Sequence, residues 1–364
     1  MNRTNDRYEL AQLRMACNPA ALAMRASPAR RVTPGRLAAA VLPATVIAGL
    51  LYAGLFIKPA PSGQAVPLPV LERRDAFFGI DMPASGVVWA AGSRGKIVRS
   101  DDGGRTWARQ AAPTAEHLQD IAAWDAQRAV AVGNRGVLLR TEDGGRHWSN
   151  VAVPLSAVDN KLLRVRTTAD GRAFAVGEMG ALLGSRDHGR NWQRLMPEQD
   201  VGLNGVAVVG DRVWVAGERG LILHSADGGA TWVRQPVPVA RSLTAVAFRD
   251  ARRGVAVGLN GTILTTENGG LDWNDRSIRD TPHLYDVAHD GEGWYAVGER
   301  DLLLQADAEA GAWRASRATG TSLAWHSEIA IRDGRRLYAG PGPSLAAQAA
   351  AGIPPANDGK GPQQ

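Results

Sequence analysis

The sequence is poor in cysteine and in aromatic residues. Its 364 residues include one cysteine, Cys17, and 6% are aromatic. A single cysteine excludes a disulfide framework, a multi-cysteine zinc site and an iron–sulfur cluster. No Walker loop, nucleophile elbow or paired-histidine motif is present, so we predict neither a metal nor a cofactor. The apolar share of 45% is enough for a packed core, which excludes a wholly disordered chain.

The surplus of positive charge is confined to the start of the chain. The formal net charge is +6, and residues 1–36 hold seven arginines against Asp6 and Glu9. Lys58 adds one more positive charge, and the residues after it carry 34 basic and 34 acidic side chains. A balanced main domain offers no broad surface for a polyanion, so we predict no nucleic-acid partner.

Residues 37–57 form a long uncharged apolar run. At about 1.5 Å per residue, its 21 positions would extend about 31 Å as a helix, enough to cross the hydrocarbon core of a bilayer. Arginines lie mainly on its N-terminal side, which predicts a basic cytoplasmic arm at residues 1–36 and a single-pass transmembrane signal anchor. The remaining chain is then expected on the periplasmic side of the inner membrane. A cleaved signal peptide is the alternative, but the run exceeds the usual apolar segment of such a peptide.

The rest of the chain divides by composition. Residues 58–69 are expected to form a linker, and residues 343–364, rich in Ala, Gly and Pro, a disordered tail. Residues 70–342 repeat a unit of about forty residues, with four predicted strands per unit, which is typical of a propeller blade. We therefore predict an all-β fold, a seven-bladed β-propeller of four-stranded blades. The closing tryptophans of the first six units are Trp107, Trp148, Trp192, Trp232, Trp273 and Trp313.

The seventh unit is incomplete in the sequence. Its first two strands are predicted at residues 323–331 and 337–340, and no tryptophan follows them. An open propeller would expose strand edges, so we predict that residues 66–71 pair with this unit and close the ring. A six-bladed ring with an appended hairpin is the alternative.

The second turn of each unit carries the pattern Ser/Thr-x-Asp-x-Gly-x-x-Trp. The carboxylate can accept backbone N–H groups across the turn, the glycine supplies a positive φ, and the tryptophan seals the hairpin on the core. Residues in these roles are predicted to be structural rather than catalytic. They are Asp102, Asp143, Asp187, Asp227 and Asn268, with Trp107, Trp148, Trp192, Trp232 and Trp273.

The first turn of each unit is rich in arginine. Symmetry would place equivalent turn residues in a ring on one rim of the propeller, and Arg side chains pair bidentately with carboxylates. We predict a docking face there for an acidic or carboxyl-bearing segment of a partner, and the alternative is an ordinary solvated turn. The arginines concerned are Arg94, Arg135, Arg219 and Arg300; Met179 and Asn260 hold the other two positions.

The repeats resemble Asp-box (bacterial neuraminidase) repeats. In their fullest form, Gly92 to Trp107 and Gly217 to Trp232, they resemble the photosystem II assembly/stability factors of photosynthetic organisms and their bacterial relatives. The resemblance covers about residues 70–340. It implies a seven-bladed, non-enzymatic propeller that binds a membrane protein during assembly of its complex, through an arginine-rich surface. We also predict that the propeller is a monomer. In non-photosynthetic bacteria, an envelope transporter complex is a candidate client.

Asp-box propellers also include sialidases and other glycoside hydrolases. A sialidase uses a tyrosine nucleophile and an arginine triad that opens with Arg-Ile-Pro, and no Arg-Ile-Pro occurs here. Tyr295 and Tyr338 lie in repeat strands, whereas Tyr285 could face either way. We predict no catalytic residue and no enzymatic activity; a glycan-binding or sialidase-like protein is the alternative.

Overall fold

The computed structural model describes residues 34–56, 70–154, 156, 158–318, 324–341 and 347–349. The chain divides into two units, residues 1–67 and 68–364. Helix α1 (Pro34–Phe56) belongs to the first unit. Within the described residues no helix is long and apolar enough to cross a membrane, so the predicted span at residues 37–57 is not supported. The predicted arm before residue 34 and the linker at residues 58–69 lie outside the described residues.

The second unit is built from antiparallel sheets whose strands follow one another in chain order. The first three sheets contain β1 (Phe77–Ala84), β2 (Val87–Gly92), β3 (Ile97–Ser100) and β4 (Ala108–Gln110); β5 (Leu118–Ala123), β6 (Ala129–Gly133), β7 (Leu138–Thr141) and β8 (Ser149–Asn150); and β9 (Leu162–Thr167), β10 (Ala173–Gly177), β11 (Leu182–Ser185) and β12 (Gln193–Arg194). The next three contain β13 (Leu203–Val209), β14 (Arg212–Gly217), β15 (Leu221–Ser225) and β16 (Val233–Arg234); β17 (Leu243–Phe248), β18 (Gly254–Gly258), β19 (Ile263–Thr266) and β20 (Asn274–Asp275); and β21 (Leu284–His289), β22 (Gly293–Gly298), β23 (Leu302–Asp307) and β24 (Trp313–Arg317). The last sheet contains β25 (Glu328–Arg332), β26 (Arg335–Ala339) and β27 (Ala347–Ala349).

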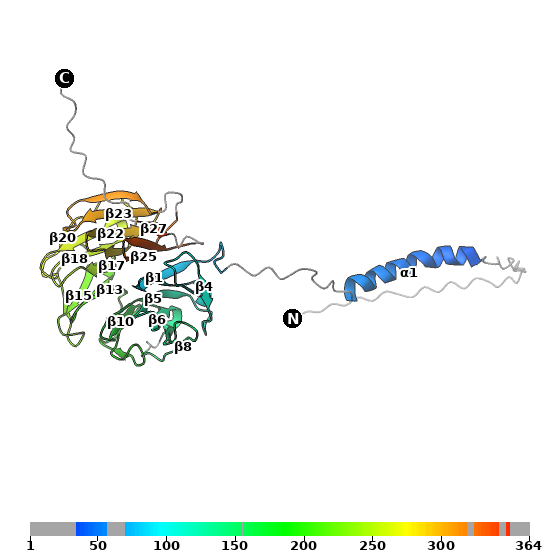
Figure 1. Cartoon of the computed structure of the whole chain (residues 1–364), viewed down its shortest axis with the longest axis horizontal. Helices are drawn as coiled ribbons and strands as arrows, with labels where there is room; N and C mark the ends of the chain where they lie inside the picture. The colour runs from blue at the N-terminus through cyan, green and yellow to red at the C-terminus, as the bar shows by residue number, and fades with distance from the viewer. Residues whose placement is uncertain are drawn as a thin grey trace, which may run out of the picture. The chain divides into compact units, whose positions relative to one another are not determined.

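The first strands of successive sheets contact one another in a closed circle around a common centre (Figure 1). The circle closes where β25 meets β1. There the Phe77 amide donates to the Gly340 carbonyl at 2.9 Å, and the Ser327 hydroxyl donates to the Phe78 carbonyl at 2.8 Å. The predicted β-propeller is therefore confirmed.

The number of four-stranded blades differs from the prediction. The described residues form six four-stranded blades, and the seventh sheet, between the last of these and the first, has three strands. The reason is that no Asp-box turn and no closing tryptophan follow Gly340 to return the chain as a fourth strand. Its third strand, β27, comes from the predicted tail and pairs with β26. Val70 and Leu71 lie in a bend rather than the predicted strand, and residues 66–69 lie outside the described residues.

Neighbouring blades are held together by large side chains from their second strands. Three residues before the glycine that ends this strand, every unit buries an apolar residue, with at most 5% of its surface exposed. Trp214 shows how: its ring stacks on Phe248 of the next blade with centroids 3.6 Å apart, and its indole N–H donates to the Gly269 carbonyl at 2.9 Å. Burial of this kind stabilises a fold by about 1.5–3 kcal/mol per side chain. The seven residues are Trp89, Val130, Phe174, Trp214, Val255, Tyr295 and Leu337.

The Asp-box carboxylates are occupied by their own turns. Asp102 accepts the backbone N–H groups of Arg105 and Thr106, both at 2.9 Å, and the Ser100 hydroxyl at 2.7 Å. The N–H of Thr106, followed by the hydroxyls of Thr106 and Ser100, holds the pKa of Asp102 below its usual range. In the next blade the backbone N–H and then the side chain of His147 lower the pKa of Asp143 to about 2. Carboxylates bound in this way remain ionised and already have hydrogen-bond partners.

Candidate functional site

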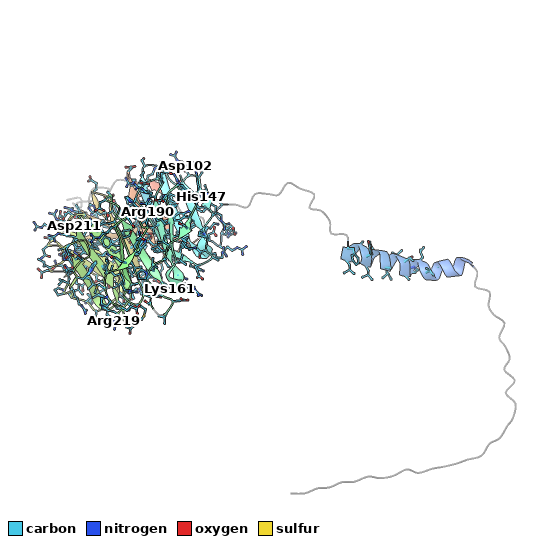
Figure 2. The ribbon with its side chains drawn as sticks, turned by 90° about the horizontal axis from the view of Figure 1, so that it is seen from below. Asp102, His147, Lys161, Arg190, Asp211 and Arg219 are labelled. Carbon is cyan, nitrogen blue, oxygen red and sulfur yellow. The ribbon has the colours of Figure 1, made fainter. Side chains whose placement is uncertain are left out.

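The two kinds of turn lie at opposite ends of each blade. In the first blade, Phe77 pairs with Gly92 beside the first turn, whereas Val88 pairs with Ser100 beside the Asp-box turn. Figure 2 shows Asp102 and His147, from Asp-box turns, at one edge of the domain and Arg219, from a first turn, at the opposite edge. The predicted arginines therefore lie on the propeller face opposite the Asp-box turns. We call the first-turn positions 94, 135, 179, 219, 260 and 300 the rim.

The rim residues share one unusual backbone conformation. The φ angles of Arg94, Arg135, Arg219 and Arg300 are 55–57°, in the left-handed region, and those of Met179 and Asn260 are 56° and 54°. Left-handed backbone is uncommon outside glycine and is tolerated best by asparagine among the other residues. Because the backbone is the same in each turn, the rim side chains leave their blades in equivalent ways. Their positions are thus set by the fold rather than by their own packing.

The rim arginines are exposed and only loosely paired within the chain. The Arg94 side chain is 56% exposed and lies 3.6 Å from Asp75, and that of Arg135 is 64% exposed and lies 2.9 Å from Asp159. Arg219 donates to the Asp200 carbonyl, and Arg300 is exposed. The Arg135–Asp159 pair is exposed on both sides, and exposed ion pairs contribute only about 0–1 kcal/mol each, so an incoming carboxylate can displace Asp159 at little cost. That these four residues bind a partner stays a prediction.

The acidic residues that precede the rim positions have local roles. Glu178 accepts the backbone N–H of Lys161 at 3.0 Å, and Glu218 accepts that of Gly202 at 3.1 Å. Glu299 accepts the hydroxyl of Tyr285 at 3.0 Å. These carboxylates fasten the first turn to the start of an inner strand.

A cavity of about 570 Å³ lies inside the rim, at the centre of the ring. Glu218 and Leu259, each one residue before a rim position, are among its lining residues. On one side, Phe78 stacks on Trp325 with ring centroids 5.6 Å apart and planes within 6°, and His117 stacks on Phe78 at 6.1 Å. We call this cavity the mouth and the three stacked rings the aromatic shelf.

A layer of buried charge forms the floor of the mouth. Arg164, which lines the mouth, pairs with Glu328 at 3.2 Å and approaches Asp286 at 3.9 Å. Arg166 pairs with Glu328 at 2.8 Å and with Asp120 at 3.1 Å. We call these five residues the central charge layer. All belong to first strands, and the three acidic residues are at most 3% exposed.

The carboxyl groups at the centre also connect neighbouring blades. Each accepts a backbone N–H from the first strand of the next blade around the ring. The bonds run from Ala123 to Asp81 at 2.7 Å, from Val165 to Asp120 at 2.8 Å, from Ile329 to Asp286 at 3.0 Å and from Ile80 to Glu328 at 2.9 Å.

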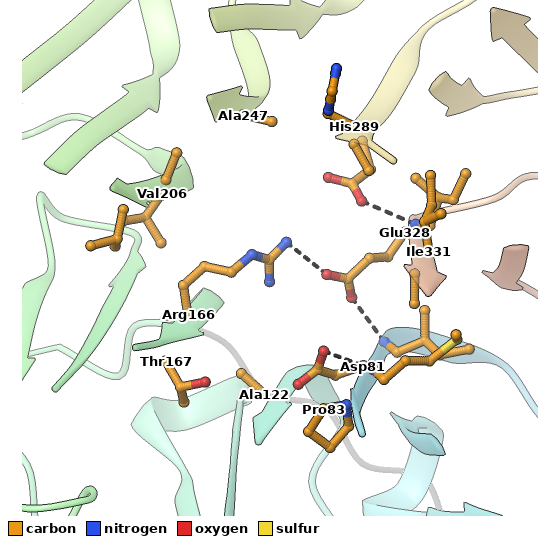
Figure 3. A pocket seen from close by; sticks show the side chains of 18 of the residues that line it. Asp81, Pro83, Ala122, Arg166, Thr167, Val206, Ala247, His289, Glu328 and Ile331 are labelled. Atoms are coloured by element: carbon orange, nitrogen blue, oxygen red, sulfur yellow. Dashed lines mark hydrogen bonds and ion pairs between the residues drawn. The ribbon is translucent and has the colours of Figure 1, made fainter. Parts of the chain in front are cut away.

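A second cavity, of about 660 Å³, opens on the Asp-box side of the central charge layer. Figure 3 shows Arg166 and Glu328 joined to each other among the residues that line it, with Asp81 below them and His289 above. Burial raises the pKa of Asp120 well above its usual range, whereas Arg166 and Arg164 overcome the effect of burial and hold the pKa of Glu328 below it. The layer separates this second cavity from the mouth.

Asp81 provides a measurable pH dependence. Burial raises its pKa to about 6 from 3.8, against the opposing effect of the Ala123 N–H. The folded protein therefore holds a proton that the unfolded chain releases, and stability is lost as the pH rises through 6. We expect the free energy of unfolding of Asp81→Asn, taken relative to that of the native chain, to rise by about 1–3 kcal/mol from pH 4.5 to pH 7.5. Urea unfolding at each pH measures this difference. A difference that stays constant across this range would contradict the assignment, and Asp159→Asn at an exposed site is the control.

The arrangement in the mouth does not match a sialidase centre. Tyr285 lines the mouth, but burial and then its hydrogen bond to Glu299 raise its pKa to about 12, which disfavours the phenolate. Arg164 is the one arginine among the residues that line the mouth in the described part of the chain, and it is already paired with Glu328. Among the described residues, no triad of arginines lines this cavity. In the described residues, no cluster of three His, Cys, Asp or Glu could hold a metal ion.

The central charge layer and the aromatic shelf were not predicted from the sequence. A usable signal for the layer is present: Asp120, Arg164, Arg166, Asp286 and Glu328 interrupt strands that otherwise bury apolar residues. Phe78, His117 and Trp325 lie outside the repeat motif, and only the closed ring brings them together.

Comparison with known proteins gives a family and a fold. The sequence profile described as Photosynthesis system II assembly factor YCF48 matches residues 107–201, 147–237 and 232–319. A solved structure titled "YCF48 bound to D1 peptide" is 18% identical with a TM-score of 0.62, covering 76% of this chain and 93% of its own. YCF48 from Cyanidioschyzon merolae is 20% identical with a TM-score of 0.61, covering 76% of this chain and 95% of its own. No curated protein matches the sequence. The resemblance drawn from the repeats is thus confirmed, and the chain belongs to the Photosynthesis system II assembly factor YCF48 family.

Proposed function

We propose that this propeller is a non-enzymatic scaffold that binds a carboxylate-bearing segment of a membrane protein while the complex of that protein is assembled. The observation that carries the proposal is the rim: Arg94, Arg135, Arg219 and Arg300 are exposed, hold one backbone conformation and surround the mouth. Guanidinium groups spaced around an opening suit an extended acidic segment, because each can form paired hydrogen bonds with a carboxylate.

Membership of the family supports a client of this kind. A solved relative is titled as bound to a D1 peptide, so the same fold accepts a peptide in at least one case. In this proposal the client of the present chain is a membrane protein, and the crosslinking experiment below would identify that client. The periplasmic location, which rests on the charges of residues 1–58, is also a proposal; a reporter enzyme fused after residue 364 tests it.

The rim is tested by photo-crosslinking in native membranes. A photoreactive amino acid at position 179 lies on the rim without replacing an arginine. We expect one recurring membrane-protein adduct, identified by mass spectrometry. Changing Arg94, Arg135, Arg219 and Arg300 together to Glu should reduce its yield by about tenfold or more, because reversed charges repel an acidic segment.

The matched control reverses four exposed arginines away from the rim: Arg105, Arg146, Arg186 and Arg234. It changes net charge equally and should leave the adduct intact. A variant with all four rim arginines changed to Asn removes the positive charges and keeps the turn backbone, since Asn260 already occupies this turn in one blade. It therefore separates an effect of charge from an effect of backbone strain. If the adduct yield is the same in the Glu variant, the rim arginines do not bind the partner and the alternative, an ordinary solvated turn, is correct. Adducts with glycan instead of protein would favour the glycan-binding alternative.

A further inference from the structure

We propose that the mouth receives one apolar side chain, with aromatic residues favoured, from the client segment whose carboxylates pair with the rim. This inference rests on the proposed function and adds a specificity element to it. The recognised segment would then be an apolar residue with acidic residues on both sides, rather than an acidic stretch of any composition.

The mouth lies directly inside the rim. Glu218 lines the mouth, and in three further blades the residue just before a rim position reaches the mouth or a residue that lines it. Leu259 lines the mouth itself; Asn134 accepts a hydrogen bond from Gln119 at 2.8 Å, and Glu299 accepts one from Tyr285 at 3.0 Å. A chain held by the rim arginines therefore passes over the mouth, and a side chain between two carboxylates can enter it.

The wall of the mouth is suited to an apolar group. Phe78 and Trp325 of the aromatic shelf are half-buried, so one part of each ring is packed and the rest faces the opening. Leu163 and Leu259 add aliphatic surface elsewhere on the wall. Aromatic rings gain from offset or edge contacts with a further ring, beyond the gain from burial alone. The volume of about 570 Å³ is within the range of pockets that enclose small organic groups.

The floor of the mouth offers no charge to a ligand. Arg164 already pairs with Glu328 at 3.2 Å and lies 3.4 Å from the carbonyls of Tyr285 and Ser327. Arg166 is likewise paired with Glu328 and Asp120. A carboxylate entering the mouth would lose its hydration without gaining an unpaired cation and would lie near Glu218 on the wall, whereas an apolar side chain loses only unfavourable contact with water. Charge recognition is therefore left to the rim.

The experiment measures binding of labelled peptides to the full chain by fluorescence anisotropy. Each peptide carries Asp residues on both sides of one central position, which is Trp, Leu, Ala or Lys, and is blocked at both ends. The readout is the ratio of dissociation constants between the Ala and Trp peptides, because that ratio cancels general charge effects. We expect the native chain to favour Trp over Ala by about tenfold and to bind the Lys peptide more weakly than the Trp peptide.

Two variants change the apolar lining of the mouth and leave the rim residues unchanged. Leu259→Glu introduces the residue that Glu178, Glu218 and Glu299 provide at the same turn position, so the fold tolerates it. Trp325→Ala removes one ring of the aromatic shelf. Each should bring the Ala-to-Trp ratio close to one. Leu271→Glu is the matched control, since Leu271 is 69% exposed in the Asp-box turn of the same blade, and it should keep the native ratio.

The outcomes separate the two proposals. Peptides that bind through the rim arginines with no preference at the central position, or that bind best with Lys there, would overturn the inference and leave the proposed function standing. An Ala-to-Trp ratio unchanged by both Leu259→Glu and Trp325→Ala would overturn it as well. If no acidic peptide binds, or if reversing the rim arginines leaves binding unchanged, the proposed function fails and the inference fails with it.

Discussion

Glu328→Gln is expected to lower the free energy of unfolding by about 3–5 kcal/mol. Glu328 is 2% exposed and is the shared partner of Arg164 and Arg166. The amide keeps the shape of the side chain but removes its charge, which leaves two guanidinium groups at the centre of the ring without their main counter-ion. Breaking a buried pair is costly for this reason, even where the intact pair contributes little net stability. Urea unfolding at neutral pH, followed by tryptophan fluorescence, measures the change.

The control for this prediction is the same substitution at the surface. Glu198 pairs with Arg194 at 3.5 Å, and its side chain is 43% exposed. Glu198→Gln should change the free energy of unfolding by about 1 kcal/mol at most, because solvent screens exposed ion pairs. If Glu328→Gln lowers the free energy of unfolding no more than Glu198→Gln does, the prediction is wrong, and water would then be solvating the guanidinium groups of the central charge layer.

Trp214→Ala is expected to cost about 3–5 kcal/mol, the range for truncation of a large buried ring. The indole is fully buried between two blades, and its loss removes the stack on Phe248 and the bond to the Gly269 carbonyl. Because the contact joins adjacent blades, the damage is to the ring rather than to one sheet. Thermal and urea unfolding should shift together in the same direction.

Val233→Ala in the same sheet is the control, since Val233 is 66% exposed. Its effect should stay within about 0.5 kcal/mol. Equal losses in the two variants would mean that the neighbouring blades repack around the missing indole, and the interface between blades would then be less specific than the stacked geometry implies.

The repeats predict the blades because the sequence of each unit contains the residues that specify its strands and its turns. Runs of β-branched residues specify strands, and the Asp-box residues Asp102 and Trp107 mark a turn whose hydrogen bonds are local. Local hydrogen bonding of this kind can be predicted from the sequence of one unit, and its recurrence in successive units strengthens the prediction. The rim was predictable for the same reason, as one turn position read across all units.

The centre of the ring was not predictable from these patterns. Asp120, Arg166 and Glu328 come from three sheets far apart in the sequence, and only ring closure makes them neighbours. Within a single strand, a charged residue that interrupts the apolar pattern is also consistent with an outward-facing position, so the interruption alone does not show that the residue is buried. The third strand of the last sheet was missed because Ala347–Ala349 has no β-branched residue to mark it.

Closure of the ring has a consequence for biosynthesis. Phe78 belongs to the first sheet, whereas Trp325 precedes the last one and emerges from the ribosome after all six four-stranded blades. Glu328, the counter-ion of both central arginines, emerges just after Trp325. A chain interrupted after Arg166 and before Trp325 therefore lacks one ring of the aromatic shelf and holds two guanidinium groups without Glu328. Translation must pass residue 328 before the mouth exists, so truncated products cannot compete with finished molecules for whatever the mouth recognises.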